Sequence, residues 1–460
     1  MITRLLKPFL STTIIAATAI GLSACGGSSS DDSSYSDSYL QFYNGSANSA
    51  STIMAEVDSS ALGSAAYGDS TSVFTLESGS MDLEFYRTDA DDQEVSIEER
   101  EVTLRDGEKL LVVLSGDYAS PSFEEFRIKR EDLADHFRLF VTSVIPDGQS
   151  YDLYMSDAGA PFSAASLLGT VNYQGLTEMT YWDPDTDSDD FDEGEYVVYL
   201  TLPGEQTPIF ESPTIDFIYA TEYTMVLRKT TGAIQGNVEI DLVINSSLVD
   251  NYADAEATAQ YRVYNSLDHL GSVTISFDGN VEESDTVTLQ ANTLSEFNAT
   301  NYGDYRLSAS TSEDASVAFN NRLVTLNQGE SKAIVIYQDS DNKLTSLSFT
   351  ESILPQVYDH QVQVANLVSD FFDVDFYFVR KDETIETAEY RVLGLDYAQT
   401  GRITLPSDYY ELIAVYDDNN DTQVLLDRTT LLGVNEETNY IITIEKDVNS
   451  ATGYVISLLH

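Results

Sequence analysis

The strongest constraint on the fold is a pattern that occurs four times along the 460 residues. Each copy opens with a short apolar segment, a polar loop and a second apolar segment. The four openings begin at Tyr39, Phe137, Gln260 and Gln361. Apolar and polar residues alternate inside these segments, as Val273, Ile275 and Phe277 do with the residues between them. A period of two places the apolar side chains on one face of a β-sheet. The repeat therefore predicts tandem modules built from strands.

Each copy also closes on two apolar segments that flank a polar turn, which is typical of a hairpin. The closing segments begin at Lys109, Tyr223, Lys332 and Tyr440. Seven or so short strands in about 100 residues indicate an immunoglobulin-like β-sandwich. We therefore predict an all-β chain of four tandem antiparallel sandwiches. Their predicted limits are 39–130, 137–252, 257–355 and 358–460. Only residues 130–136, between the first two modules, have a sequence suited to a turn or two of helix.

The first strand ends on the same residue type in three copies, at Asn44, Asn265 and Asn366, and on Ser143 in the second copy. Asparagine favours turns because its side chain can hydrogen-bond to nearby backbone groups. We therefore expect a turn after each of these positions.

The first 25 residues predict a signal peptide. Arg4 and Lys7 precede an apolar run, no acidic residue occurs before Asp31, and the run is too short for a membrane-spanning helix. Leu22-Ser23-Ala24-Cys25 resembles the lipobox of bacterial lipoproteins, in which the cysteine receives a diacylglycerol group. Cys25 is the sole cysteine of the chain, so a disulfide partner is lacking.

This resemblance implies cleavage after residue 24, a lipid on Cys25 and firm attachment by several acyl chains. Residues 25–38 are rich in Gly, Ser and Asp and predict a flexible tether. Gly26 follows the cysteine where an inner-membrane lipoprotein of enterobacteria has Asp. We therefore expect an outer-membrane location, on either the periplasmic or the cell-surface face.

The chain carries 77 acidic and 23 basic residues, which gives a net charge of −54. Such a charge disfavours binding to nucleic acid or to anionic lipid. Two interpretations stay open: a solvated acidic surface suited to a salty habitat, or a set of divalent-cation sites.

One acidic stretch has the spacing of a calcium loop. Aspartates occupy alternate positions at Asp183, Asp185, Asp187 and Asp189. Oxygen ligands at positions 1, 3 and 5 are typical of an EF-hand loop. The match ends at Ser188, where such a loop has Gly, and at Gly194, where it has a bidentate Glu. The stretch is either an irregular Ca²⁺ site closed by Glu193 or Glu195, or a solvated insertion.

Trp182, the sole tryptophan, precedes this loop and follows Tyr181. Exposed aromatic rings can stack on sugars, whereas buried rings belong to a core. Trp182 and Tyr181 are therefore candidate ligand-binding residues, with core packing as the alternative.

Sequence signals of catalysis are few. The histidines are scattered along the chain, at His136, His269, His360 and His460. The chain contains no GxSxG elbow, no phosphate-binding GxxxxGK[ST] loop and no Cys/His zinc cluster. We therefore expect a non-catalytic protein that requires no cofactor.

The repeat also resembles the bacterial domain of unknown function numbered 4397, found in tandem in signal-bearing and often lipid-anchored proteins. The similar features are the opening strand that ends on Asn, an Asp-x-Tyr strand and a late turn. The Asp-x-Tyr strand occurs as Asp152-Leu153-Tyr154 and Asp375-Phe376-Tyr377, and the late turn occurs at Leu104 to Lys109, Leu326 to Ser331 and Leu432 to Tyr440. A fourth similar feature is the segment "AYGD" at Ala66 to Asp69. The resemblance implies an extracytoplasmic immunoglobulin-like module without catalytic residues.

Two functional classes follow. The first is a lipid-anchored cell-envelope protein that mediates interaction, presentation or spacing at the outer membrane, with an envelope protein or polysaccharide as partner. The second is a surface lipoprotein that binds polysaccharide or another small ligand, with Ca²⁺ as a possible aid.

Overall fold

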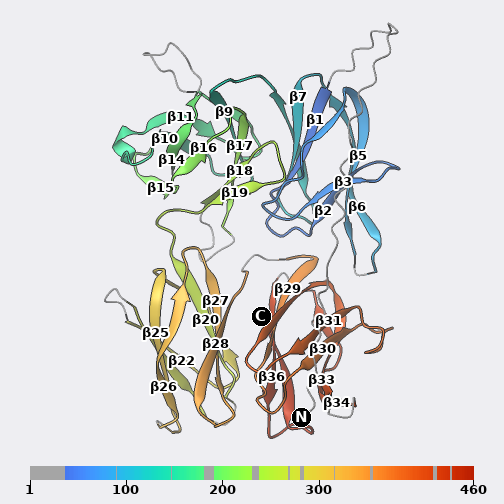
Figure 1. Ribbon diagram of the computed structural model, residues 1–460, viewed down its shortest axis with the longest axis vertical. Helices are drawn as coiled ribbons and strands as arrows, with labels where there is room; N and C mark the ends of the chain where they lie inside the picture. Colours follow the sequence, from blue (N-terminus) through green and yellow to red (C-terminus); the bar gives the residue numbers. More distant parts are fainter. Residues whose placement is uncertain are drawn as a thin grey trace, which may run out of the picture. The chain divides into compact units, whose positions relative to one another are not determined.

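The computed structural model describes residues 37–460 apart from 90, 147, 181–190, 231–237, 268–269, 280–283, 315, 353–355, 418–421 and 436–437. The described chain consists of strands and one short 3₁₀ helix, η1 (Phe162–Ala164). The prediction of an all-β chain of tandem sandwiches is confirmed (Figure 1). Residues 130–136 form a turn that leads into a strand at His136 and contain no helix.

Modules 1 and 2 occupy the first half of the described chain. The strands of module 1 are β1 (Asp37–Asn44), β2 (Thr52–Glu56), β3 (Ala61–Ala65), β4 (Phe74–Glu77), β5 (Gly79–Thr88), β6 (Glu94–Leu104), β7 (Glu108–Ser115) and β8 (Ser122–Lys129). Those of module 2 are β9 (His136–Ser143), β10 (Tyr151–Asp157), β11 (Ser166–Val171), β12 (Thr177–Met179), β13 (Phe191–Asp192), β14 (Gly194–Thr201), β15 (Pro208–Glu211), β16 (Ile215–Phe217), β17 (Glu222–Lys229), β18 (Val238–Val243) and β19 (Val249–Tyr252).

Modules 3 and 4 follow. The strands of module 3 are β20 (Ala259–Asn265), β21 (Val273–Asp278), β22 (Ser284–Leu289), β23 (Thr293–Leu294), β24 (Asn298–Thr300), β25 (Gly303–Thr311), β26 (Ala318–Leu326), β27 (Ser331–Gln338) and β28 (Leu344–Thr350). Those of module 4 are β29 (Asp359–Asn366), β30 (Val374–Val379), β31 (Tyr390–Leu395), β32 (Thr400–Pro406), β33 (Asp408–Asp417), β34 (Gln423–Arg428), β35 (Leu432–Val434), β36 (Tyr440–Lys446) and β37 (Tyr454–Leu459).

Every module has the same two-sheet plan. In module 1 the sheets have the strand orders β4-β1-β7-β8 and β3-β2-β5-β6, and the other modules repeat this arrangement. Each module closes on the predicted antiparallel hairpin, β7–β8, β17–β18, β27–β28 or β36–β37. The opening strand pairs in parallel with the first strand of that hairpin, in the ladders β1–β7, β9–β17, β20–β27 and β29–β36. The sandwiches are thus antiparallel with one parallel ladder each, which the repeat did not predict.

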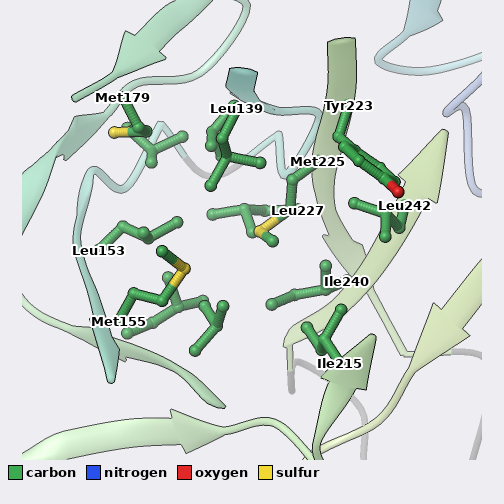
Figure 2. Packing of buried hydrophobic residues seen from close by; sticks show 14 of the residues in the cluster. Leu139, Leu153, Met155, Met179, Ile215, Tyr223, Met225, Leu227, Ile240 and Leu242 are labelled. Atoms are coloured by element: carbon green, nitrogen blue, oxygen red, sulfur yellow. The ribbon is translucent and has the colours of Figure 1, made fainter. Parts of the chain in front are cut away.

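Each module encloses its own apolar core between its two sheets. In module 3 the alternating residues Val273, Ile275 and Phe277 are at most 1% exposed and lie in this core, as predicted. The core of module 2 draws on both sheets, with Leu153 and Met155 facing Leu227 and Ile240 (Figure 2). Burial of this apolar surface is the main favourable term in folding, so each module has the core that a separate sandwich needs.

The asparagine that ends the opening strand connects the two sheets. In module 4 the Nδ2 group of Asn366 donates to the carbonyl of Leu395, the last residue of β31, at 2.9 Å. Its Oδ1 accepts from the backbone N–H of Val368 at 2.9 Å, as in an Asx turn. Asn44 and Asn265 make the equivalent pair of bonds in modules 1 and 3. The predicted turn is therefore confirmed, and the same side chain also joins the sheets.

Module 2 keeps half of this arrangement. The Oγ of Ser143 accepts from the backbone N–H of Ile145 at 3.3 Å, so the turn is present. The serine hydroxyl accepts the turn bond in place of the asparagine Oδ1. Serine has no counterpart of the asparagine Nδ2 group, which donates to the other sheet.

We predict that Asn366→Ala lowers the free energy of unfolding by about 1–3 kcal/mol, because it leaves a buried carbonyl and a buried N–H without partners. Urea titration followed by circular dichroism measures the loss. Asn449→Ala, at an exposed turn position of the same module, is the control and should change stability by less than about 0.5 kcal/mol. Equal stabilities of the two variants would contradict the role assigned to Asn366.

Candidate functional site

Most residues that the sequence singled out lie outside the described residues. These are Cys25, the aspartates Asp183, Asp185, Asp187 and Asp189, and the aromatic pair Tyr181 and Trp182. The lipid-attachment, calcium and sugar-stacking hypotheses for these positions therefore stay predictions.

Glu193 and Glu195, the two residues proposed to close the calcium loop, are both described and exposed. Glu193 lies between β13 and β14, where its backbone N–H donates to the carbonyl of Asp135 at 3.3 Å. Within the described part of the chain, no group of three or more His, Cys, Asp or Glu side chains is arranged to hold a metal ion.

The shorter acidic turns have a structural explanation. In module 1 the carboxylate of Asp89 accepts the backbone N–H groups of Asp91 and Gln93, each at 2.9 Å. These bonds lower the pKa of Asp89. Asp339 accepts the backbone N–H groups of Asp341 and Lys343 in module 3 with the same geometry. Both aspartates therefore use their carboxylates to close hairpin turns.

One Ser–His contact is present in module 4. His360 lies 2.8 Å from the Oγ of Ser407 through Nε2 and 2.9 Å from the carbonyl of Thr438 through Nδ1. A carbonyl only accepts, so Nδ1 carries a proton, while the hydroxyl of Ser407 donates to the carbonyl of Val357 at 2.7 Å. His360 is 0% exposed, and this burial lowers its pKa. The contact is thus a buried structural bond, closed to a substrate.

The sequence analysis did not predict that side chains of consecutive modules are buried against each other. Tyr43, Leu111 and Val113 of module 1 form one apolar cluster with Val226 and Val243 of module 2. These residues lie on the faces of β1, β7, β17 and β18 that point away from the cores of their own modules. Modules 1 and 2 therefore each bury part of the second face of the opening sheet as well.

A buried ionic network lies beside this cluster. The hydroxyl of Tyr43 donates to Oδ2 of Asp241 at 2.6 Å, and Nε of Arg228 donates to the same oxygen at 2.7 Å. Arg228 also contacts Glu239 at 2.7 Å, and Asn251 donates to the other Asp241 oxygen at 2.8 Å. Asp241 is 0% exposed. Burial, followed by the charge of Asp241, raises the pKa of Tyr43 well above its ordinary value.

The "AYGD" segment of module 1 packs against this network. Gly68 has a φ of +80°, and a Cβ at this position would lie 3.3 Å from both Arg228 Nε and Asp241 Oδ2. The ring of Tyr67 lies 5.0 Å from the guanidinium carbon of Arg228, and its hydroxyl donates to the carbonyl of Lys229 at 2.9 Å. Burial raises the pKa of Tyr67 to about 12. This motif therefore has a structural role at the interface of modules 1 and 2.

Modules 3 and 4 are joined in a related way. Tyr264, which precedes Asn265 as Tyr43 precedes Asn44, lies in an apolar cluster with Val335, Ala365 and Ile441. Its hydroxyl donates to the Glu445 carboxylate of module 4 at 2.9 Å. Both odd-numbered modules therefore bond a carboxylate of the following module through this tyrosine.

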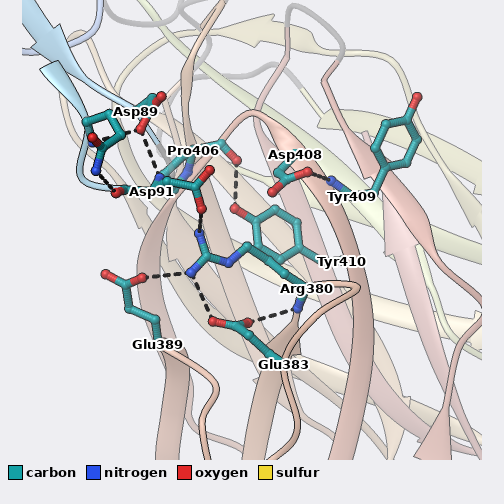
Figure 3. A network of polar contacts seen from close by, with 10 residues as sticks. Asp89, Asp91, Arg380, Glu383, Glu389, Pro406, Asp408, Tyr409 and Tyr410 are labelled. Atoms are coloured by element: carbon teal, nitrogen blue, oxygen red, sulfur yellow. Dashed lines mark hydrogen bonds and ion pairs between the residues drawn. The ribbon is translucent and has the colours of Figure 1, made fainter. Parts of the chain in front are cut away.

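A polar network joins residues of module 1 to residues of module 4 (Figure 3). Arg380 forms ion pairs with Glu383 at 3.0 Å and Glu389 at 3.1 Å, and with Asp91 of module 1 at 3.2 Å. Asp91 is 78% exposed at its side chain. Because Asp91 is exposed, its pair with Arg380 contributes about 0–1 kcal/mol. The position of the Arg380 side chain is therefore set mainly by its two pairs within module 4, with Glu383 and Glu389.

A cavity of about 530 Å³ is lined largely by residues with polar side chains. Side chains from modules 1, 3 and 4 line it, including Tyr67, Glu330, Glu351, Asp359, Arg402 and Thr404. Burial raises the pKa of Asp359. Arg402 donates to the carbonyl of Thr350 at 3.4 Å. Hydroxyl, carboxylate and guanidinium groups around one space suit a ligand rich in hydrogen-bonding groups.

Sequence reasoning missed the buried charges of the interfaces. A signal was present, because Glu239 and Asp241 are two acidic residues inside the short segment from Val238 to Val243, and a charge inside a buried strand needs a partner. The partner of Asp241 in module 1, Tyr43, lies 198 positions away in the chain, and one sequence does not reveal such pairs.

No family model matches the chain, and no curated protein matches it. The resemblance to the domain numbered 4397 therefore stays a prediction. No helix in the described part of the chain has the length and apolar character needed to cross a bilayer.

Among solved structures, the chain is similar to the Bacillus anthracis TIE protein at 8% identity, with 89% of this chain and 67% of that chain covered and a TM-score of 0.16. It is similar to a putative cell adhesion protein of Bacteroides fragilis at 11% identity, with coverage of 42% and 84% and a TM-score of 0.12. It is also similar to BcpA, the major pilin subunit of Bacillus cereus, at 11% identity, with coverage of 67% and 97% and a TM-score of 0.14.

Proposed function

We propose that this chain is a non-catalytic, lipid-anchored protein of the bacterial cell envelope that acts in interaction, presentation or spacing at the outer membrane. The observation that supports this most is the joining of modules through buried side chains, such as Tyr43 on Asp241 and Tyr264 on Glu445. Joined in this way, sandwiches hold their outer surfaces in a fixed relation, which suits a protein that displays a binding surface.

The anchor in this proposal is Cys25, at the end of the apolar segment and before the Gly/Ser/Asp tether. Several acyl chains on one residue bind a membrane far more firmly than a single chain does. The net charge of −54 disfavours attachment to anionic lipid by charge alone. The lipid therefore carries the whole attachment.

We predict that Cys25→Ser moves the protein from the membrane fraction to the soluble fraction, because the thiol that carries the lipid is lost. Cell fractionation followed by immunoblotting measures the shift, and mass spectrometry of the N-terminal peptide detects the acyl groups. Ser33→Ala, in the tether, is the control and should stay with the membrane. If Cys25→Ser also stays there, the anchor is not lipid on Cys25. Protease treatment of intact cells then distinguishes the surface face from the periplasmic face.

The polar cavity supports a second candidate, a surface lipoprotein that binds a polysaccharide or another small polar ligand. Tyr67 and Arg402 lie on its wall together with carboxylates that can accept sugar hydroxyls. A glycan array on the mature protein tests this. Binding lost in Arg402→Ala places the sugar in the cavity, whereas binding lost in Trp182→Ala places it at the aspartate-rich loop. An array without reproducible binding removes this candidate.

A further inference from the structure

Lys109 is a lysine buried against uncharged partners. It is the second residue of β7 and is 0% exposed. Its Nζ donates to Oδ1 of Asn245 at 3.0 Å and to Oε1 of Gln41 at 3.4 Å. Both acceptors are neutral carboxamides. Buried lysines usually pair with a carboxylate because desolvation disfavours an isolated ammonium.

This environment favours the neutral amine. Burial lowers the pKa of Lys109 to about 8, even though the negative charge of Glu222 acts in the opposite direction. With a pKa near 8, roughly a tenth of the side chains are neutral amines at pH 7. A neutral amine is a nucleophile, whereas an ammonium is not.

Asn245 presents its carboxamide to this amine from module 2. Its oxygen faces Lys109, and its Nδ2 donates to Oγ1 of Thr221 at 2.7 Å and to Oε2 of Glu222 at 3.3 Å. The side chain of Glu222 is 1% exposed. The carboxamide of Asn245 thus contacts the amine of Lys109 through its oxygen and the carboxylate of Glu222 through its nitrogen, where solvent is largely excluded. Glu222 also pairs with Arg130 at 3.5 Å.

Two further bonds keep the segment of Asn245 against module 1. The Nε2 of Gln41 donates to the carbonyls of Ile244 at 3.0 Å and Ser246 at 2.9 Å, on either side of Asn245. The reacting groups are therefore held in place by both modules, which lowers the entropy cost of a reaction between them.

We propose that Lys109 and Asn245 form an isopeptide bond, promoted by Glu222, that covalently cross-links module 1 to module 2. This inference is independent of the membrane anchor and of the cavity. The bond joins residues that are 136 positions apart. It makes permanent an interface that buried apolar and ionic groups already hold together.

The reaction needs no oxidant or metal. The neutral amine of Lys109 attacks Cγ of Asn245 through Nζ. Glu222, which accepts from Nδ2 of Asn245, takes the proton that the attacking nitrogen loses and donates it to Nδ2. The Cγ–Nδ2 bond then breaks, and the nitrogen leaves as ammonia. One C–N bond forms, one breaks, and Glu222 is regenerated.

The corresponding place in module 3 lacks the nucleophile. In the parallel ladder of module 1, Lys109 pairs with Tyr39, five residues before Asn44. The corresponding pair in module 3 is Ser331 with Gln260, five residues before Asn265. The neighbouring Lys332 contacts Glu330 at 3.1 Å and the carbonyl of Thr325. We therefore expect this cross-link between modules 1 and 2 and not between modules 3 and 4.

Peptide mapping of the denatured full-length protein by mass spectrometry tests the proposal. The expected result is a branched peptide that joins the segments containing Lys109 and Asn245, lighter than their sum by one ammonia, with no tryptic cleavage after Lys109. Glu222→Gln should reduce the branched peptide at least tenfold, and Lys332→Met, the control, should leave it unchanged.

Separate peptides with an unmodified Lys109 would overturn the proposal. Loss of ammonia from Asn245 without a branch would also overturn it, because that product is a succinimide. Mapping of the wild-type protein decides the matter even if Glu222→Gln does not fold.

Discussion

Asp241→Ala is expected to lower the free energy of unfolding of modules 1 and 2 by roughly 3–5 kcal/mol, the cost of removing one partner from a buried ion pair. The carboxylate of Asp241 accepts from Tyr43, Arg228 and Asn251 and is 0% exposed. The substitution removes one of the two carboxylates that pair with the guanidinium of Arg228, and it leaves the phenol of Tyr43 without this acceptor. Differential scanning calorimetry of the full chain measures the change.

The matched control for this variant is Asp250→Ala, because Asp250 is an exposed residue of β19 in the same module. It should change stability by less than about 0.5 kcal/mol. The double variant Asp241→Ala, Arg228→Met should recover part of the loss, because it removes the charge that the single variant leaves uncompensated. If Asp241→Ala is as stable as the control, the network does not hold the two modules together.

The sequence predicted the inward faces of the sandwiches well, because alternation records which side chains avoid water. Val273 and Ile275 lie in the core of module 3, as their alternation indicates. The parallel ladder between opening strand and closing hairpin was not predictable in this way. Parallel and antiparallel strands show the same alternation of apolar and polar residues. The path of the chain between two strands decides which pairing forms.

The second face of the opening sheet shows where the pattern stops being informative. Tyr264 and Arg262 alternate with core residues, and this places them outside the core of module 3. Tyr264 is nevertheless 1% exposed, because module 4 covers it. Burial by a neighbouring module depends on how two folded modules dock. The alternation of apolar and polar residues along a strand does not predict that contact. Lys109 was likewise visible only as the start of a hairpin, since its neighbour Asn245 comes from another module.

Arg262→Met should have a comparable effect in module 3. Arg262 donates to Glu351 through Nε at 2.9 Å and through Nη2 at 2.6 Å, and both side chains are at most 10% exposed. Methionine keeps much of the volume but leaves the carboxylate without its bidentate cation. We expect a loss of roughly 3–5 kcal/mol at neutral pH, measured by urea denaturation. Arg306→Met, at an exposed position of β25, is the control and should be nearly neutral.

The pH dependence of this loss provides the stricter test. Burial raises the pKa of Glu351 even in the presence of Arg262, and the loss of the cation should raise that pKa further. A carboxyl group whose pKa is higher in the folded state binds more protons there than in the unfolded state. Stability therefore falls as the pH rises from the unfolded pKa through the folded pKa. The deficit of Arg262→Met should accordingly be largest at neutral pH and shrink on acidification, and Arg262→Met, Glu351→Gln should recover much of it. A deficit that is independent of pH would mean that Arg262 acts through packing, for example against the Phe297 ring 4.7 Å from its guanidinium carbon, and not through its charge.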